Sequence, residues 1–225
     1  MTQDDTCNSG HAKALTDLAR PTLHGLRVDP AMTIAGWNNR KIAVTSKPEA
    51  FFLPMCDGDK GQRFCIFSPA QGTAIRGMVL HIHPFAEEMN KSRRMVALQA
   101  RALSDAGFAV LQFDLLGCGD SSGDFGDATW QAWVDDAVRA CQWLTQRTSA
   151  STSNDDLIPL WLWGLRAGCL LAIEAAVRLK ITPNFLFWQP VSEGKQLLQQ
   201  FMRLKTARNM IDKGAKASTG DLHQQ

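Results

Sequence analysis

The feature that most constrains the fold is a repeated alternation between short apolar runs and longer segments with helical periodicity. The run from Gly77 to His83 is almost continuously apolar and ends at a proline, as a strand buried on both faces would. Strand-plus-helix units of about thirty residues predict a mostly parallel α/β sheet. We expect strands over 63–67, 77–83, 108–113, 158–163 and 184–188, and helices capped at Ser92 and ending at Gly107, from about Thr129 through Leu144, and from Ala167 to Leu179.

Changes in composition divide the chain into three parts. Residues 1–47 have no sustained period and are interpreted as an N-terminal extension, with poor order as one reading. Residues 48–213 carry the α/β pattern and end in an expected amphipathic helix over 193–213, and residues 214–225 are a polar tail. The length of 225 residues fits one domain.

Composition also excludes several classes of function. A net charge of +2 gives no reason to expect a nucleic-acid or membrane-surface partner. The longest apolar runs fall far short of the ~20 residues that a membrane span needs, and the N-terminus has neither the basic flank nor the apolar stretch of a secretory signal. The six cysteines include no Cys-x-x-Cys pair, so neither a disulfide framework nor a zinc site is indicated. We therefore expect a cytoplasmic protein without a metal or cofactor.

Candidate functional residues follow three of the expected strands, at the sheet edge where ligands of open parallel sheets bind. The three segments are 81–85, the glycine-rich 114–121, and Gly164-Leu165-Arg166-Ala167-Gly168. The third is the most specific, because a strand, then Gly-x-X-x-Gly, then an Ala-rich helix is the sequence form of a nucleophile elbow. Such glycines allow a tight strand-to-helix approach, and the central residue is held in a strained, exposed conformation at the helix N-terminus.

In this order, His83-Pro84-Phe85, the loop from Phe113 to Ser121 and the Gly164–Gly168 elbow resemble the serine-aminopeptidase-type lipase and esterase branch of the α/β-hydrolases. A narrower resemblance covers about residues 48–210. Segments 83–95, 114–125 and 163–168 are similar to the second hydrolase associated with exosortase A systems, a bacterial family that accompanies exopolysaccharide synthesis and the sorting of PEP-CTERM proteins.

This resemblance implies a three-layer α/β-hydrolase-like fold and an ester or acyl hydrolase. It also implies that the first loop supplies an oxyanion-hole amide, for which His83, Phe85 and Ala86 are the candidates. The second loop would frame the active-site entrance. An arginine at the elbow is itself part of this family resemblance, so Arg166 need not be a local lesion.

Two features depart from a working serine hydrolase. Arg166 occupies the position of the attacking serine, and a guanidinium has only donors and stays protonated, so it cannot attack a carbonyl. An acid and a histidine base would normally follow the elbow, but no strand-like run follows Trp188 and His223 lies in the polar tail. The Ser-His-Asp triad is not identifiable, and whether the chain is an enzyme stays open. The C-terminal strands are expected to be missing, which would leave an open sheet edge for a protein partner.

Two interpretations of Arg166 are open. In one, its guanidinium and the helix amides bind an anionic group, and the protein is a non-catalytic module for an anionic or acyl small molecule. In the other, the elbow is degenerate and Arg166 pairs with Asp114 or Glu88. The ligand-binding candidates are Gly164, Leu165, Arg166, Ala167, Gly168, Asp114, Gly117, Gly119, Ser121 and Glu88.

The remaining polar residues of the three loops also have two interpretations each. His83 either orients groups near an oxyanion hole or hydrogen-bonds a neighbouring backbone group, and His81 is expected to be a packed core histidine. Asp114 is expected to hold Arg166 or the amides of the 117–121 loop. Lys91, Arg93 and Arg94 form either a solvated face or an extension of positive potential around Arg166.

Overall fold

The computed structural model describes residues 47–55, 61–149, 158–203 and 206. The predicted N-terminal extension over 1–47, apart from Lys47, and the predicted polar tail over 214–225 lie outside the described residues. In the part of the chain that is described, no helix is long and apolar enough to cross a membrane.

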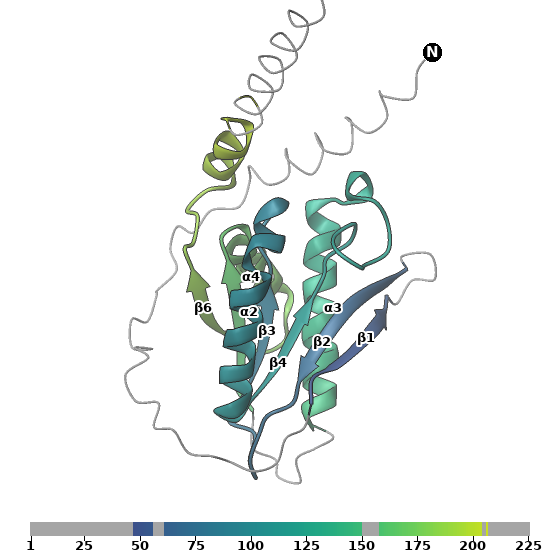
Figure 1. Ribbon diagram of the computed structural model, residues 1–225, viewed down its shortest axis with the longest axis vertical. Coiled ribbons are helices and arrows are strands. Elements are labelled where there is room, and N and C mark those ends of the chain that lie inside the picture. The colour runs from purple at the N-terminus through teal and green to yellow at the C-terminus, as the bar shows by residue number, and fades with distance from the viewer. Residues whose placement is uncertain (1–46, 56–60, 150–157, 204–205, 207–225) are drawn as a thin grey trace, which may run out of the picture.

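Six strands form one sheet in the order β1-β2-β4-β3-β5-β6. The strands β4 (Phe108–Phe113), β3 (Gly77–Ile82), β5 (Leu160–Leu165) and β6 (Asn184–Trp188) pair in parallel. Their carboxyl ends therefore meet at one edge, the upper edge in Figure 1. The prediction of a mostly parallel sheet is confirmed, and the predicted strands are shifted by at most a few residues.

The other edge of the sheet is antiparallel. β2 (Gln62–Ser68) pairs with both β4 and β1 (Glu49–Pro54), with Phe51 opposite Cys65. β2 was predicted but β1 was not, because the consecutive apolar residues Phe51, Phe52 and Leu53 show no polar and apolar alternation in the sequence. In the structure Phe51 and Leu53 pack against the core, while Phe52 is exposed. β1 is thus a strand defined by its partner.

Helices cover the two faces of the sheet unequally. α2 (Glu87–Asp105) lies on one face, while α3 (Trp130–Ser149) and α4 (Ala167–Arg178) lie on the other, which gives three layers (Figure 1). Leu80, Leu111 and Leu162 point toward α3 and α4 within the larger core cluster. Val79, Val110 and Trp163 point toward α2 within the smaller one. The three-layer prediction is confirmed.

The expected cap of α2 at Ser92 is wrong. The helix begins earlier, at Glu87, after Ala86 in a left-handed conformation with φ 52° and ψ −131°, and no side chain caps it. Ser92 lies inside the helix and donates to the Met89 carbonyl 3.0 Å away. The expected end at Gly107 is confirmed, since this glycine has φ 91°.

A further helical segment follows β6 and lies above the carboxyl edge of the sheet (Figure 1). Its described part covers residues 194–203, within the expected amphipathic helix. Leu197 is buried, and the Phe201 ring packs on Phe85 with centroids 5.3 Å apart. This contact connects the segment to the loop that follows β3.

Candidate active site

The elbow is formed by the tight connection between β5 and α4. β5 ends at Leu165, α4 begins at Ala167, and Arg166 between them has φ 54° and ψ −112°. A non-glycine residue in this region is strained, and such strain is concentrated at functional sites. Arg166 therefore has the backbone position that the sequence predicted for the central elbow residue.

The two elbow glycines are needed for close approach. A Cβ on Gly164 would lie 2.6 Å from the Cα of Cys169, inside the first turn of α4. A Cβ on Gly168 would overlap the carbonyl oxygen of Ile82, at the end of β3. The first turn of α4 is thereby held against the loop that contains His83, so two of the three expected loops meet.

The Arg166 side chain has two partners. Its Nε lies 3.4 Å from Oε1 of Glu88, and its Nη2 donates to Oε1 of Gln200 over 2.7 Å. The guanidinium side chain is 24% exposed, so it borders the surface. Pairing with Glu88 is thus as expected, whereas pairing with Asp114 is not formed. Gln200 is a partner that sequence reasoning missed, because it comes from a helix with no motif of its own.

His83 acts as a neutral spacer between two loops. Its Nδ1 lies 2.7 Å from the Pro84 carbonyl and must donate to it, and Nε2 accepts from the Leu115 amide over 3.2 Å. Burial lowers the pKa of His83, which favours this neutral form. Both ring nitrogens are used, so the backbone-bonding interpretation of His83 fits the structure and a general-base role does not.

The other described histidine, His81, lies in the core as expected. Its Nδ1 is 3.2 Å from the Trp163 carbonyl and its ring is 4.3 Å from the Trp163 ring. Burial lowers the pKa of His81 to about 3, so it is uncharged at neutral pH. Neither described histidine is therefore available as a base beside Arg166.

Two backbone amides at the meeting point of the loops have no partner. The Ala86 and Ala167 N–H groups donate to no other group among the residues that the structure describes. Ala86 is the N-cap residue of α2 and Ala167 is the first residue of α4, so both belong to helix N-termini, where free amides favour negative charge. Phe85, the third candidate of this loop, instead packs its ring against Phe125 and Trp133.

Asp114 organises the second loop. Its Oδ2 accepts from Arg93 Nη2 over 3.0 Å and from the Asp120 amide over 3.2 Å. The Ser121 hydroxyl donates to the Asp114 carbonyl over 2.6 Å and accepts from the Phe64 amide of β2 over 3.0 Å. The expected role of Asp114 in holding loop amides is present, while its cationic partner is Arg93 and not Arg166.

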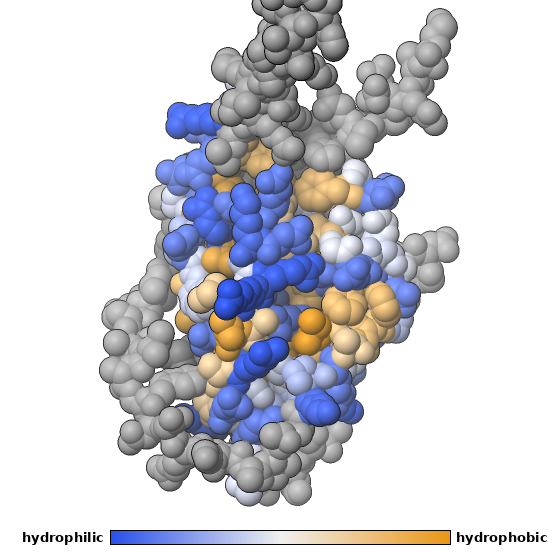
Figure 2. All heavy atoms as spheres, in the orientation of Figure 1, coloured by the Kyte–Doolittle hydropathy of each residue, from blue (hydrophilic) through white to orange (hydrophobic). Residues whose placement is uncertain are grey.

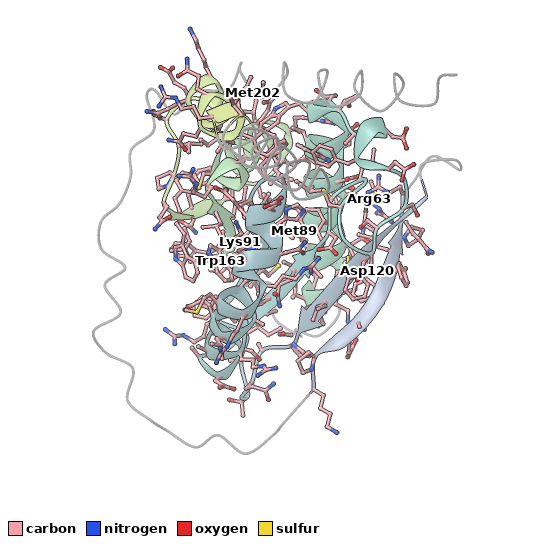
Figure 3. All side chains as sticks on the ribbon, turned by 45° about the horizontal axis from the view of Figure 1, so that its top comes forward. Arg63, Met89, Lys91, Asp120, Trp163 and Met202 are labelled. Atoms are coloured by element: carbon pink, nitrogen blue, oxygen red, sulfur yellow. The ribbon has the colours of Figure 1, made fainter. Side chains whose placement is uncertain are left out.

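Two glycines of this loop require their positive φ. Gly117 has φ 69° and Gly119 has φ 55°, and a Cβ on either would overlap Asp124 or Asp114, respectively. The loop is thus wrapped tightly around the Asp114 carboxylate. Figure 3 looks obliquely onto this edge, with Met89 of α2 near the centre and Asp120 of the loop to one side.

A buried ion pair beneath the second loop was missed by sequence reasoning. Arg63 Nε donates to Asp136 Oδ2 over 2.8 Å, and both side chains are almost fully buried. The same oxygen accepts from the Leu116 amide over 2.8 Å, which ties the loop to α3. Burial raises the pKa of Asp136. The only sign of this ion pair in the sequence was Arg63, a charged residue at an inward-facing position of the mostly apolar strand β2.

The two described cysteines near the loops do not replace the serine, and the described side chains form no metal site. Burial raises the pKa of Cys118, the cysteine of the second loop, to about 12, so its thiol is not a nucleophile at neutral pH. Burial likewise raises the pKa of Cys169, next to the elbow, to about 12. Within the described ranges, no group of three or more His, Cys, Asp or Glu side chains could hold a metal ion.

Comparison with known proteins agrees with this architecture. The family model described as X-Pro dipeptidyl-peptidase (S15 family) matches residues 63–195, which include β2, both loops and the elbow. The human protein ABHD12B is 29% identical over 176 residues, covering 73% of this chain. The chain spans only 41% of the length of that relative.

Solved structures share the fold at low identity. A soluble variant of yeast monoglyceride lipase, in complex with a substrate analogue, matches with a TM-score of 0.52 at 24% identity, over 68% of this chain and 47% of the lipase. An α/β serine hydrolase homologue from Coxiella burnetii matches with a TM-score of 0.52 at 21% identity, over 69% of this chain and 70% of its own. The chain therefore belongs to the X-Pro dipeptidyl-peptidase (S15) family and has an α/β-hydrolase fold.

Proposed function

We propose that this chain is the elbow-bearing part of a cytoplasmic α/β-hydrolase that acts on an acyl ester or related acyl compound in bacterial exosortase, PEP-CTERM and exopolysaccharide systems. The biological setting rests on the resemblance of segments 83–95, 114–125 and 163–168 to the hydrolases of those systems. The class of reaction rests on family membership and on the geometry of the elbow.

The observation that carries the proposal is the pair of unpartnered amides at Ala86 and Ala167. In enzymes with a nucleophile elbow, the amide after the nucleophile and an amide of the β3 loop bind the developing oxyanion. Ala167 and Ala86 have these two places along the chain. The proposal is that they receive the carbonyl oxygen of an acyl group.

Arg166 would act in this site as a cation and not as a nucleophile. Its guanidinium cannot attack a carbonyl, so the attacking group would be water and no acyl-enzyme would form. Oxyanion binding alone leaves roughly 10³–10⁴-fold acceleration over water in a serine protease without its triad. We therefore expect slow ester hydrolysis that is linear from the first turnover.

The test is stopped-flow and steady-state hydrolysis of p-nitrophenyl butyrate by the purified chain. Slow turnover without a burst is expected, and Arg166→Ala should lower it by roughly tenfold, less than the about 10²–10³ that loss of a direct oxyanion donor costs. Arg147→Ala, which removes an exposed arginine in the last turn of α3, is the control and should leave the rate unchanged. A burst, or a rate that Arg166→Ala leaves unaltered, would contradict the mechanism.

The non-catalytic anion-binding interpretation of Arg166 has less support. Its Nε and Nη2 already have Glu88 and Gln200 as partners, which reduces what remains for a ligand. Calorimetry with acetyl phosphate distinguishes the two: binding that Arg166→Glu abolishes, in a protein without ester turnover, would favour the binding module.

A further inference from the structure

A groove of about 330 Å³ lies on the α2 face, between this helix and strands β2 and β4. Its walls include Phe64, Ile66, Val96, Ala97, Gln112 and Arg101. The volume falls at the lower end of the range for small-molecule pockets, about 300–1,000 Å³. Figure 2 looks onto this face and shows hydrophobic side chains directly beside hydrophilic ones. The groove is not the elbow, whose Arg166 and Ala167 do not line it.

The apolar part of the groove is left incompletely covered by the fold. Phe64 and Ile66 face the groove and are only half-buried. Cys65 and Phe67, which alternate with them along β2, point to the other face of the sheet and are buried. Ile66 pairs with Gln112 of β4, so both side chains share the face under the groove. An apolar group placed here would bury surface that is now exposed to water, which is favourable.

The charged part of the groove is one uncompensated cation. Arg93 is neutralised by Asp114 at 3.0 Å. Arg101, two helical turns further along the same side of α2, has no ion-pair or hydrogen-bond partner among the described residues. His81 and His83 also line the groove, but burial lowers the pKa of both, so they add no charge at neutral pH.

We propose that this groove binds a small amphipathic carboxylate of the medium-chain fatty-acid type. The alkyl chain lies on Phe64 and Ile66, and the carboxylate pairs with the Arg101 guanidinium, which can bind it through two parallel hydrogen bonds. The site does not include the elbow residues Arg166 and Ala167, although His83 and Asp114 of the neighbouring loops also line it. Binding there does not depend on the chemistry of the elbow.

The test is calorimetric titration of the full chain with octanoate and, as a neutral analogue, 1-octanol. Arg101→Gln should weaken octanoate binding by roughly tenfold, since a hydrogen-bonded charge pair contributes about 1.5 kcal/mol or more, and should leave octanol binding unchanged. Arg94→Gln removes a neighbouring exposed arginine that does not line the groove, and should change neither. Equal affinity of Arg101→Gln and the parent chain for octanoate would overturn the proposal.

A second pair of variants tests the location. Ala97→Trp would fill the groove and should abolish binding of both probes, while Met95→Trp, at a 59% exposed position of the same helix, should not. Octanoate binding that depends on Arg166 and not on Arg101 would place the ligand at the elbow and overturn the groove. Loss of ester turnover in Arg166→Ala with octanoate binding intact would separate this site from the proposed hydrolytic one.

Discussion

The two faces of the sheet differ in how completely they are covered. On one face, α3 and α4 seal side chains such as Leu80, Leu111 and Leu162, none of which exposes surface to water. On the other face, α2 is the one helix among the described residues that covers the middle of the sheet, and Phe64 and Trp188 on its flanks stay half-buried. Buried histidines, the groove and the unpaired Arg101 all belong to this second face.

We expect the two faces to contribute differently, one mainly to the stability of the fold and the other to ligand binding. A face closed by two helices gains stability from burial of apolar surface and from close packing. A face with one helix leaves polar groups and apolar surface within reach of a ligand. The comparison can be tested on each face with matched substitutions.

The largest effect is expected from the buried ion pair on the α3 side. Asp136→Asn removes the carboxylate that pairs with the buried Arg63 guanidinium, which should lower the free energy of unfolding by about 3–5 kcal/mol in urea denaturation. The neighbouring Asp135 pairs with Arg178 at the surface, and Asp135→Asn should cost at most about 1 kcal/mol. Similar losses in both variants would mean that α3 does not exclude water from Asp136.

The next effect compares one leucine from each side. Leu144→Ala in α3 removes a fully buried side chain and should cost about 2–5 kcal/mol of unfolding free energy. Leu98→Ala in α2 removes one that is 47% exposed and should change stability by about 0.5 kcal/mol or less. A loss of unfolding free energy in Leu98→Ala as large as in Leu144→Ala would mean that Leu98 is shielded from water, contrary to its exposure in the structure.

The α2 face should also make stability depend on pH. His81 is neutral in the folded chain, with a pKa of about 3, whereas the unfolded chain takes up its proton near the ordinary value of 6.5. The stabilisation is complete above pH 6.5 and is lost as pH falls toward 3, at about 1.4 kcal/mol per pH unit. The unfolding free energy of the parent chain should therefore fall by about 2 kcal/mol more between pH 7 and pH 5 than that of His81→Gln. An NMR titration that shows the His81 ring gaining a proton above pH 5 would contradict this.

The smallest effect concerns the start of α2. Ala86→Gly should raise the unfolding free energy by about 1 kcal/mol, because glycine adopts φ 52° without strain. Ala102→Gly, the same substitution inside α2, should lower it by about 1 kcal/mol through lost helix propensity. Opposite signs within one helix are the expected outcome of thermal unfolding, and equal signs would show that Ala86 is unstrained.

Local patterns were sufficient to predict most of the fold. β3, β4 and β6 are almost continuously apolar runs, and the spacing of the elbow glycines predicts the connection from β5 to α4. β1 could not be predicted, because its pairing with β2 is a long-range contact that leaves no period in its own residues. The start of α2 was misplaced because a left-handed Ala86 has no propensity signal.

The backbone of the candidate site was predicted, but of the side-chain partners of Arg166 only Glu88 was. The order of residues was sufficient to predict the three loops, of which the elbow is one, because glycine spacing reflects local geometry. Pairing of Arg166 with Gln200, and of Arg63 with Asp136, depends on which helix faces align in three dimensions. The pairing of Asp114 with Arg93 likewise depends on how α2 lies against the second loop.

The close contacts of Gly164 and Gly168 separate what can change at this elbow from what cannot. Any side chain at either glycine collides with backbone, so the frame tolerates no variation there. Position 166 faces the other way: its side chain borders solvent and is 24% exposed, and its partners are the ends of flexible chains. We therefore expect a substitution of Arg166 to leave the fold intact. The residue at position 166 can therefore change during evolution, and the chemistry of the site with it, while the backbone of the elbow stays the same.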